Sequence, residues 1–222
     1  MPTHPHIRRP ASLLLVILVT GLLFSGCSST PKQPPIPVGS LKLGVADFTQ
    51  PNTASDMLAG YAHENSPHID KKVLNAMDAV LASVLADKSQ NSFRSKESAQ
   101  RCLQLVHRRT NKKNKQSALR TWAAIGRCMG VDLLIVPQLY VWRERDGGSF
   151  GVVTPARVVM DIFVLDVRNE SLISRSHFDE TQSALTGNLF EADKFFKRSA
   201  KWISANDLAR EGMEKAVKEL GL

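Results

Sequence analysis

A serine in a glycine-rich segment is the first candidate for chemistry. Gly147–Gly151 matches the pattern G-x-S-x-G, with Ser149 at the position of a nucleophile. In hydrolases this pattern needs a strand before it and a helix after it, because that turn aims the serine hydroxyl above the sheet. Strand-like sequence lies on both sides here, over Val131–Arg145 and Gly151–Val167. We therefore predict a hairpin turn and no catalytic residue.

Two further groups of charged residues fall in the expected strands. His177, Asp179 and Glu180 cluster on the third of them, and Asp161 lies on the second. His177 and Asp179 are two residues apart, so they share one face of a strand, as two metal ligands could. One strand supplies too few ligands, so an ion-paired strand end is favoured and no metal is expected. Asp161 lies between apolar residues and is a candidate buried acid, with Arg175 on the next strand as its expected partner. A structural ion pair is favoured over catalysis, and no cofactor is expected.

The densest charge in the sequence is the run His107-Arg108-Arg109-Thr110-Asn111-Lys112-Lys113-Asn114-Lys115. Such a run is most often a solvated connection between helices. The alternative is a contact for an anionic surface, and its candidate anion-binding residues are Arg108, Arg109, Lys112, Lys113 and Lys115. The formal net charge of +8 suits an anionic partner. Phospholipid head groups, lipopolysaccharide or acidic glycans are favoured over nucleic acid.

The first 27 residues have the pattern of an export signal. Met1–Pro10 carries two arginines and no acid, and Ala11–Phe24 is a run of 14 residues without charge. As a helix this run would reach about 21 Å, whereas a hydrocarbon core of about 30 Å needs closer to 20 residues, so a signal peptide is favoured over a membrane span. Phe24-Ser25-Gly26-Cys27 follows and resembles the lipobox of bacterial lipoproteins. The resemblance implies that Cys27 is acylated and becomes the new N-terminus.

The signal divides the chain into three expected segments. Residues 1–26 are the lipoprotein signal peptide, and residues 27–40 are the acylated cysteine and a proline-rich tether of about 40 Å at roughly 3.1 Å per residue. Residues 41–222 are long enough for one periplasmic domain with its own core. In lipoproteins an Asp after the cysteine favours the inner membrane. Ser28 and Ser29 stand there instead, so the resemblance implies an outer-membrane anchor facing the periplasm.

Two further cysteines, Cys102 and Cys128, remain when Cys27 is acylated. Export would place them in an oxidising compartment, where an even number of thiols tends to pair. Each falls on an expected helix, and the two helices flank the basic run. Two inert core thiols are the alternative, and a disulfide is favoured.

Periodicity predicts the order of elements from residue 41 onward. Leu41–Phe48 alternates as a strand, and Phe93–Arg94 is a short second strand. Val73–Leu85 has apolar residues at every third or fourth position, which predicts an amphipathic helix, with Ser66-Pro67 as its expected start. Two more helices are expected over residues 95–106 and 117–129.

The second half predicts three antiparallel strands and a final helix. The strands are expected over residues 131–145, 151–167 and 172–181. The helix has a capping box at Ser204 and Asp207. The whole order predicts an α/β fold, a single-domain sandwich in which a mixed sheet with a C-terminal antiparallel three-strand meander packs against helices.

This order resembles a small α/β domain of bacterial envelope proteins. The residues that carry the resemblance are Leu43–Phe48 before a long helix and Gly130–Val136 at the start of the meander. Similar domains occur in the N-terminal part of the Tol-Pal translocation protein, the periplasmic part of the curli secretion channel, lipoprotein activators of penicillin-binding proteins and the Pel polysaccharide export lipoprotein. A shared fold does not fix a shared task.

Three functions remain open at the level of sequence. The favoured one is a non-catalytic docking or scaffold component of a cell-envelope assembly, with an envelope protein as its partner. The second is a ring-forming subunit of a secretion or polysaccharide export complex, which would be a homo-oligomer. The third, an envelope-polymer hydrolase, is disfavoured because no catalytic set is found, and we expect the protein not to be an enzyme.

Overall fold

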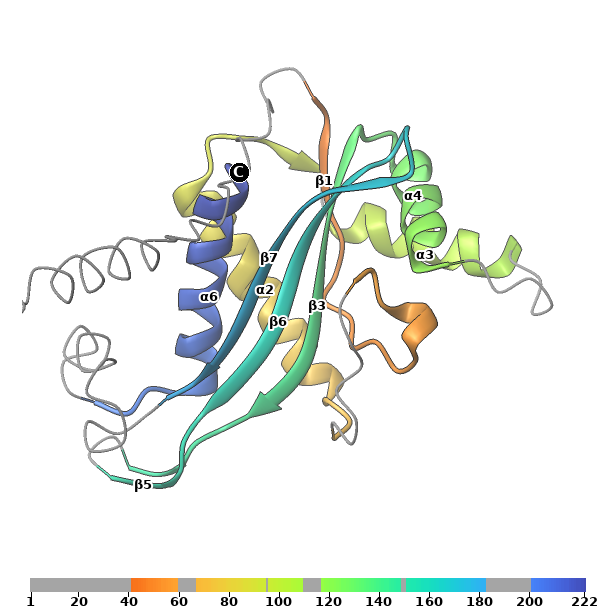
Figure 1. The fold of residues 1–222 in the computed structure, drawn as a ribbon. Helices are drawn as coiled ribbons and strands as arrows, with labels where there is room; N and C mark the ends of the chain where they lie inside the picture. Colours follow the sequence, from red (N-terminus) through yellow and green to blue (C-terminus); the bar gives the residue numbers. More distant parts are fainter. Residues whose placement is uncertain (1–40, 60–66, 95, 110–116, 149–150, 183–200) are drawn as a thin grey trace, which may run out of the picture. The chain divides into compact units, whose positions relative to one another are not determined.

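The computed structural model describes residues 41–59, 67–94, 96–109, 117–148, 151–182 and 201–222. Within them a five-stranded sheet has the order β2-β1-β3-β6-β7. Its strands are β1 (Leu43–Val45), β2 (Phe93–Arg94), β3 (Leu133–Arg143), β6 (Arg157–Asp166) and β7 (Ser171–Thr181). β1 pairs in parallel with β2 and β3, and β3, β6 and β7 form an antiparallel meander. The predicted mixed sheet and meander are confirmed (Figure 1).

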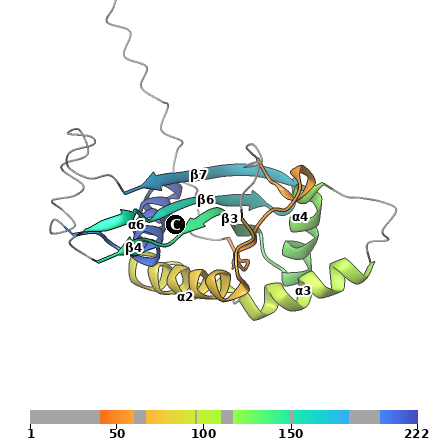
Figure 2. The ribbon, with the colours of Figure 1, turned by 90° about the horizontal axis from the view of Figure 1, so that it is seen from below.

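Helices cover both faces of this sheet because successive strand residues point to opposite sides. Leu133 and Ile135 of β3 share a core with α2 (Lys71–Lys88) and α6 (Ala205–Leu220). Leu134 and Val136 point the other way and share a second core with α3 (Lys96–Arg109) and α4 (Ala118–Met129). Figure 2 shows the strands seen from below, with α2 and α6 at one end and the α3–α4 pair at the other. Among the described helices, none has the length and apolar character needed to cross a membrane.

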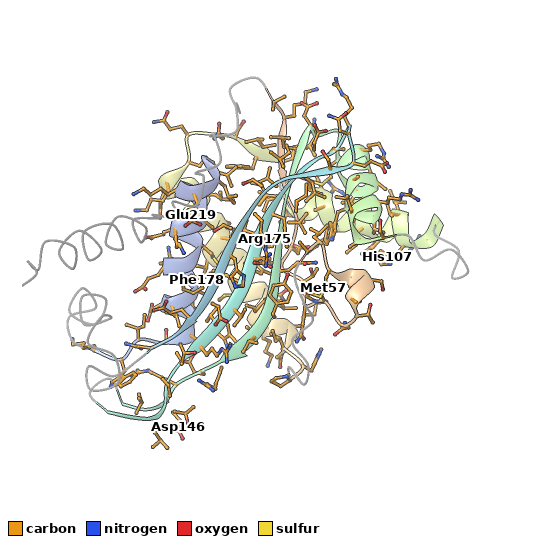
Figure 3. All side chains as sticks on the ribbon, in the orientation of Figure 1. Met57, His107, Asp146, Arg175, Phe178 and Glu219 are labelled. Carbon is orange, nitrogen blue, oxygen red and sulfur yellow. A yellow bond between two sulfur atoms is a disulfide. The ribbon has the colours of Figure 1, made fainter. Side chains whose placement is uncertain are left out.

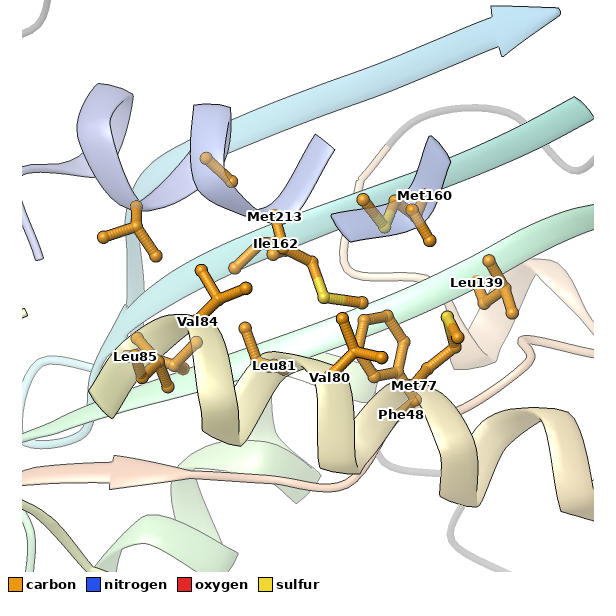
Figure 4. Close-up of a cluster of buried hydrophobic side chains, with 14 of the residues drawn as sticks. Phe48, Met77, Val80, Leu81, Val84, Leu85, Leu139, Met160, Ile162 and Met213 are labelled. Carbon is orange, nitrogen blue, oxygen red and sulfur yellow. The ribbon is translucent and has the colours of Figure 1, made fainter. Parts of the chain in front are cut away.

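The apolar stripe of α2 forms the centre of the first core, as predicted. Its buried hydrophobic residues are Met77, Val80, Leu81, Val84 and Leu85. They face Leu139 of β3, Met160 and Ile162 of β6 and Met213 of α6 (Figure 4). Spacing by three and four residues therefore placed one continuous face of the helix against the sheet.

The start of α2 differs from the prediction. The helix begins at Lys71, and its N-cap is Asp70, whose carboxylate accepts a hydrogen bond from the backbone N–H of Lys72 at 2.7 Å. Pro67 lies outside the helix, four residues before Lys71, so Ser66-Pro67 is not the cap. The physical reason is a side chain far away in sequence. The side-chain amide of Gln50 donates a hydrogen bond to the carbonyl of Pro67 and accepts one from the N–H of Ile69. These two backbone groups are therefore engaged before the helix begins.

Two other predicted helix ends hold, whereas the strand predicted over 151–167 is divided into β5 (Val152–Thr154) and β6. α4 ends at Gly130, whose φ of 67° is the left-handed conformation that glycine adopts easily. α6 begins at the predicted capping box, in which Ser204 and Asp207 satisfy each other's backbone N–H. Gly126 lets α4 approach the sheet, since a Cβ there would lie 2.4 Å from a methyl carbon of Val167. A short 3-10 helix, η1 (Ala54–Asp56), lies in the segment between β1 and α2.

Candidate functional site

A buried carboxylate on β6 holds two side chains of β7. Asp161 is 1% exposed, and its Oδ2 accepts a hydrogen bond from Arg175 Nη2 at 2.8 Å. Its Oδ1 lies 2.7 Å from His177 Nδ1, and Arg175 Nη2 lies 3.3 Å from the same ring nitrogen. The antiparallel register sets this contact, since His177 is directly opposite Asp161. The predicted Asp161–Arg175 ion pair is confirmed.

Two aromatic side chains complete the cluster. The guanidinium of Arg175 lies 5.7 Å from the ring centre of Phe163, within cation–π range (Figure 3 labels Arg175). Burial raises the pKa of Tyr140, and the Asp161 carboxylate nearby raises it further. The phenol therefore stays protonated and donates to Gln138 Oε1 at 3.1 Å. With both oxygens of Asp161 engaged by neighbours, the carboxylate positions the side chains around it.

Replacing Arg175 with Met tests whether the Asp161–Arg175 ion pair stabilises the fold. The substitution keeps much of the apolar stem but leaves the Asp161 carboxylate, a buried charge, with one partner fewer. We expect unfolding free energy to fall by about 2–3 kcal/mol in urea denaturation. The double variant Arg175→Met/Asp161→Leu removes both charges and should recover part of the loss. A single variant as stable as the original protein would contradict the structural role.

His177 and Asp179 contact different partners. Asp179 contacts Arg157 at 3.4 Å, whereas His177 turns to Asp161. Among the described residues, no group of three potential ligands could hold a metal ion. The charged end of β7 is thus ion-paired, which is the interpretation favoured from sequence.

The glycine-rich segment lies in a hairpin. β4 (Asp146–Gly147) pairs antiparallel with β5 (Val152–Thr154), and β6 follows as another strand. Ser149 itself lies outside the described residues. Since the segment joins strand to strand, the strand-turn-helix context that a nucleophile elbow requires is missing.

A groove of about 420 Å³ lies between the α3–α4 pair and the chain segment after β1. One wall is apolar and comes from the two helices, with Leu103, Val106, Ala118 and Trp122. The other wall is polar and comes from the loop, with Thr49, Gln50, Asn52, Ser55 and Asp56. His107 lies at the α3 side (Figure 3). The groove is thus amphipathic, and the sequence patterns did not point to it.

Gln138 fixes the loop wall of this groove. Its amide nitrogen donates to the carbonyl of Asp56 at 2.9 Å, and its amide oxygen accepts from the N–H of Leu58 at 3.3 Å. The partners are about 80 residues away in sequence, so no local pattern indicated this role. Tyr140 donates to the same amide oxygen. Hydrogen bonds therefore connect the Asp161 cluster to the groove.

The opposite wall is crosslinked. Cys102 of α3 and Cys128 of α4 form a disulfide, with their Cα atoms 5.7 Å apart, a separation such a bond spans readily. Of the candidate anion-binding residues, Arg108 is exposed on α3 and Arg109 is the last residue of that helix. Lys112, Lys113 and Lys115 lie outside the described residues, as do Cys27 and the tether.

No protein-family model matches the sequence, and a comparison with curated proteins gives no match. Solved structures do resemble the domain. The PelC dodecamer from Paraburkholderia phytofirmans is 14% identical with a TM-score of 0.45, over 86% of this chain and 93% of that one. The LpoB C-terminal domain from Salmonella enterica is 10% identical with a TM-score of 0.37, over 64% and 83%. Lipoprotein GNA1162 from Neisseria meningitidis is 14% identical with a TM-score of 0.39, over 71% and 98%. Each of these similarities is partial and concerns the fold alone.

Proposed function

We propose that the protein is an outer-membrane-anchored periplasmic lipoprotein that acts as a non-catalytic docking component of a cell-envelope assembly. The observation that carries the anchor is the uncharged run of 14 residues that ends directly in Ser25-Gly26-Cys27. Acyl chains on Cys27 would hold the chain at the membrane, because each buried methylene contributes about 0.8 kcal/mol. The proline-rich residues 28–40 would let the domain stand off the surface.

The contacts of the described side chains favour docking over catalysis. The oxygens of Asp161 are both engaged by neighbouring side chains. The segment around Ser149 joins two strands. The groove, by contrast, has an apolar wall facing a polar one, and internal contacts hold each wall: the disulfide on one side and Gln138 on the other. An extended or helical segment of a partner with one apolar side would fit such walls.

Replacing Cys27 with Ser should abolish membrane retention, because the thiol that receives the acyl chains is gone. The measurement is cell fractionation together with metabolic labelling by radioactive palmitate. The original protein should label and sediment with outer membranes, and the Ser variant should do neither. A variant that still fractionates with outer membranes, from a parent that never labels, would contradict the anchor.

A photo-crosslinking amino acid at Thr121, on the groove, should trap the partner in cells. The matched control is the same amino acid at Lys218, which is exposed on α6, a helix that packs in the first core and contributes no residue to the groove. We expect one discrete adduct from Thr121 and none from Lys218. Identical adducts from both positions would contradict docking at the groove. An adduct at a whole-number multiple of the protein's own mass would favour the ring-forming subunit instead.

A further inference from the structure

The basic charge of the chain is concentrated in one short stretch. Residues 96–130 contain nine lysines and arginines against the single acid Glu97, a net charge of +8. The whole chain also has a formal net charge of +8, so acidic and basic residues are equal in number in the rest of the chain. This stretch coincides with the α3–α4 pair and its connection. The excess charge of the protein therefore belongs to one supersecondary unit, which the Cys102–Cys128 disulfide crosslinks.

The outer face of α3 combines positive charge with an exposed apolar side chain. Arg101, Leu105 and Arg108 are spaced by four and three residues, which places them on one side of the helix. All three are exposed, and Leu105 is 48% exposed. Among the described residues, only Val153 and Leu172 are other large hydrophobic side chains with comparable exposure. The opposite side of α3 is buried through Ala99 and Cys102, so the helix cannot turn Leu105 inward.

The exposed leucine between two arginines indicates which kind of anionic partner fits this face. An acidic glycan offers negative charge but little apolar surface, so it would leave Leu105 in water. An anionic bilayer offers both, because head groups attract the arginines while a leucine side chain enters the boundary with the acyl chains. The arginine stems can lie along the same boundary with their charged ends at the phosphates. The composition of this face therefore favours a lipid surface.

The start of the domain lies beside the same unit. The N–H of Lys42 donates to Asp132 Oδ2 at 2.9 Å, and the N–H of Asp132 donates to the carbonyl of Lys42 at 2.8 Å. Asp132 follows the end of α4 by three residues. The proposed tether thus joins the domain close to the C-terminal end of α4. An anchored protein could therefore bring α3 to the membrane.

We propose that the outer face of α3, with Arg101, Leu105 and Arg108, is a docking surface for a bilayer that contains anionic phospholipid. The acyl anchor would keep the protein at the membrane, and this face would set how the domain lies on it. The inference extends the proposed function but does not require acylation, because the contact belongs to the domain.

The test uses the full chain with Cys27→Ser, so that loss of the anchor and loss of this surface are separate results. Binding to phosphatidylcholine vesicles with and without phosphatidylglycerol is measured by co-sedimentation, and the readout is the increase that phosphatidylglycerol causes. Arg101→Gln/Arg108→Gln should weaken that component about thirtyfold, since each surface cation contributes about 1 kcal/mol. Leu105→Ser should weaken it about fivefold to tenfold through lost apolar contact. Lys71→Gln/Lys72→Gln, an equal charge change on exposed residues of α2, should change it by less than about twofold.

Three results would overturn the proposal. One is an equal loss of binding in the α2 control, which would mean attraction by net charge alone. Another is unchanged binding in the Leu105→Ser variant together with full competition by an acidic polysaccharide, which would assign the face to a glycan. The third is no difference between the two vesicle compositions. Circular dichroism of each variant verifies that the domain remains folded.

Discussion

Leu81→Ala is expected to lower the free energy of unfolding by about 2–5 kcal/mol, as truncations of buried leucines do. Leu81 is 2% exposed and lies in the middle of the α2 stripe, against the sheet core (Figure 4). The cost combines the lost transfer of the side chain from water with the cavity that remains between helix and sheet. Few single changes in a domain of this size would cost as much, and α2 itself would keep its helical propensity because alanine is the best helix former.

The matched control is Leu105→Ala, the same chemical change on a leucine of α3 that is 48% exposed. It should alter stability by less than about 0.5 kcal/mol, as surface substitutions do. Urea denaturation followed by circular dichroism measures both variants. Equal and small losses would mean that α2 does not cover the sheet.

Removing the disulfide is the second large effect that we expect. Cys102 and Cys128 are 26 residues apart in sequence, so the bond closes a loop of that size in the unfolded chain. Loop-closure entropy predicts that Cys102→Ala/Cys128→Ala lowers stability by about 3–4 kcal/mol. The folded helices should persist, because Ile125 and Met129 of α4 still pack in the second core. Urea denaturation of the parent and of the double alanine variant measures the difference between their free energies of unfolding.

Reductant provides the control for the disulfide. Dithiothreitol should destabilise the parent by about the same 3–4 kcal/mol and leave the double alanine variant unchanged. Maleimide labelling without reductant should leave both thiols of the exported parent unmodified. If both thiols react, the bond does not form in the exported protein and the entropy argument does not apply.

Patterns that repeat within one element predicted most of this fold. The stripe of α2 can be read from sequence because burial depends on spacing by three and four residues alone. The meander follows from long alternating runs separated by turn residues, and its register then brings Arg175 and His177 to Asp161. That ion pair could be expected because a lone acid among apolar strand residues needs a partner and the next strand offers one.

Contacts between distant segments were not predictable in the same way. Gln138 is one polar residue within a strand, and its importance comes from Asp56 and Leu58, which reach it only in the folded chain. The observed cap of α2 has the same origin, since the side chain of Gln50 binds the backbone of Pro67 and Ile69 just before Asp70. The groove depends on both loop contacts and on the crosslinked helices, so no single motif could indicate it.

The attachment of the chain to β1 has a mechanical consequence. β1 is an interior strand, with β2 on one side and β3 on the other, and Lys42 is bound to Asp132 just before it. A pull along the tether, directed along β1, would load the flanking hydrogen bonds in shear, so that they resist together instead of opening one after another. An edge strand loaded crosswise would peel apart at low force. If the proposed anchor and partner pull against each other, the domain should therefore withstand the load. Single-molecule pulling from residue 41 should show one abrupt rupture instead of gradual extension.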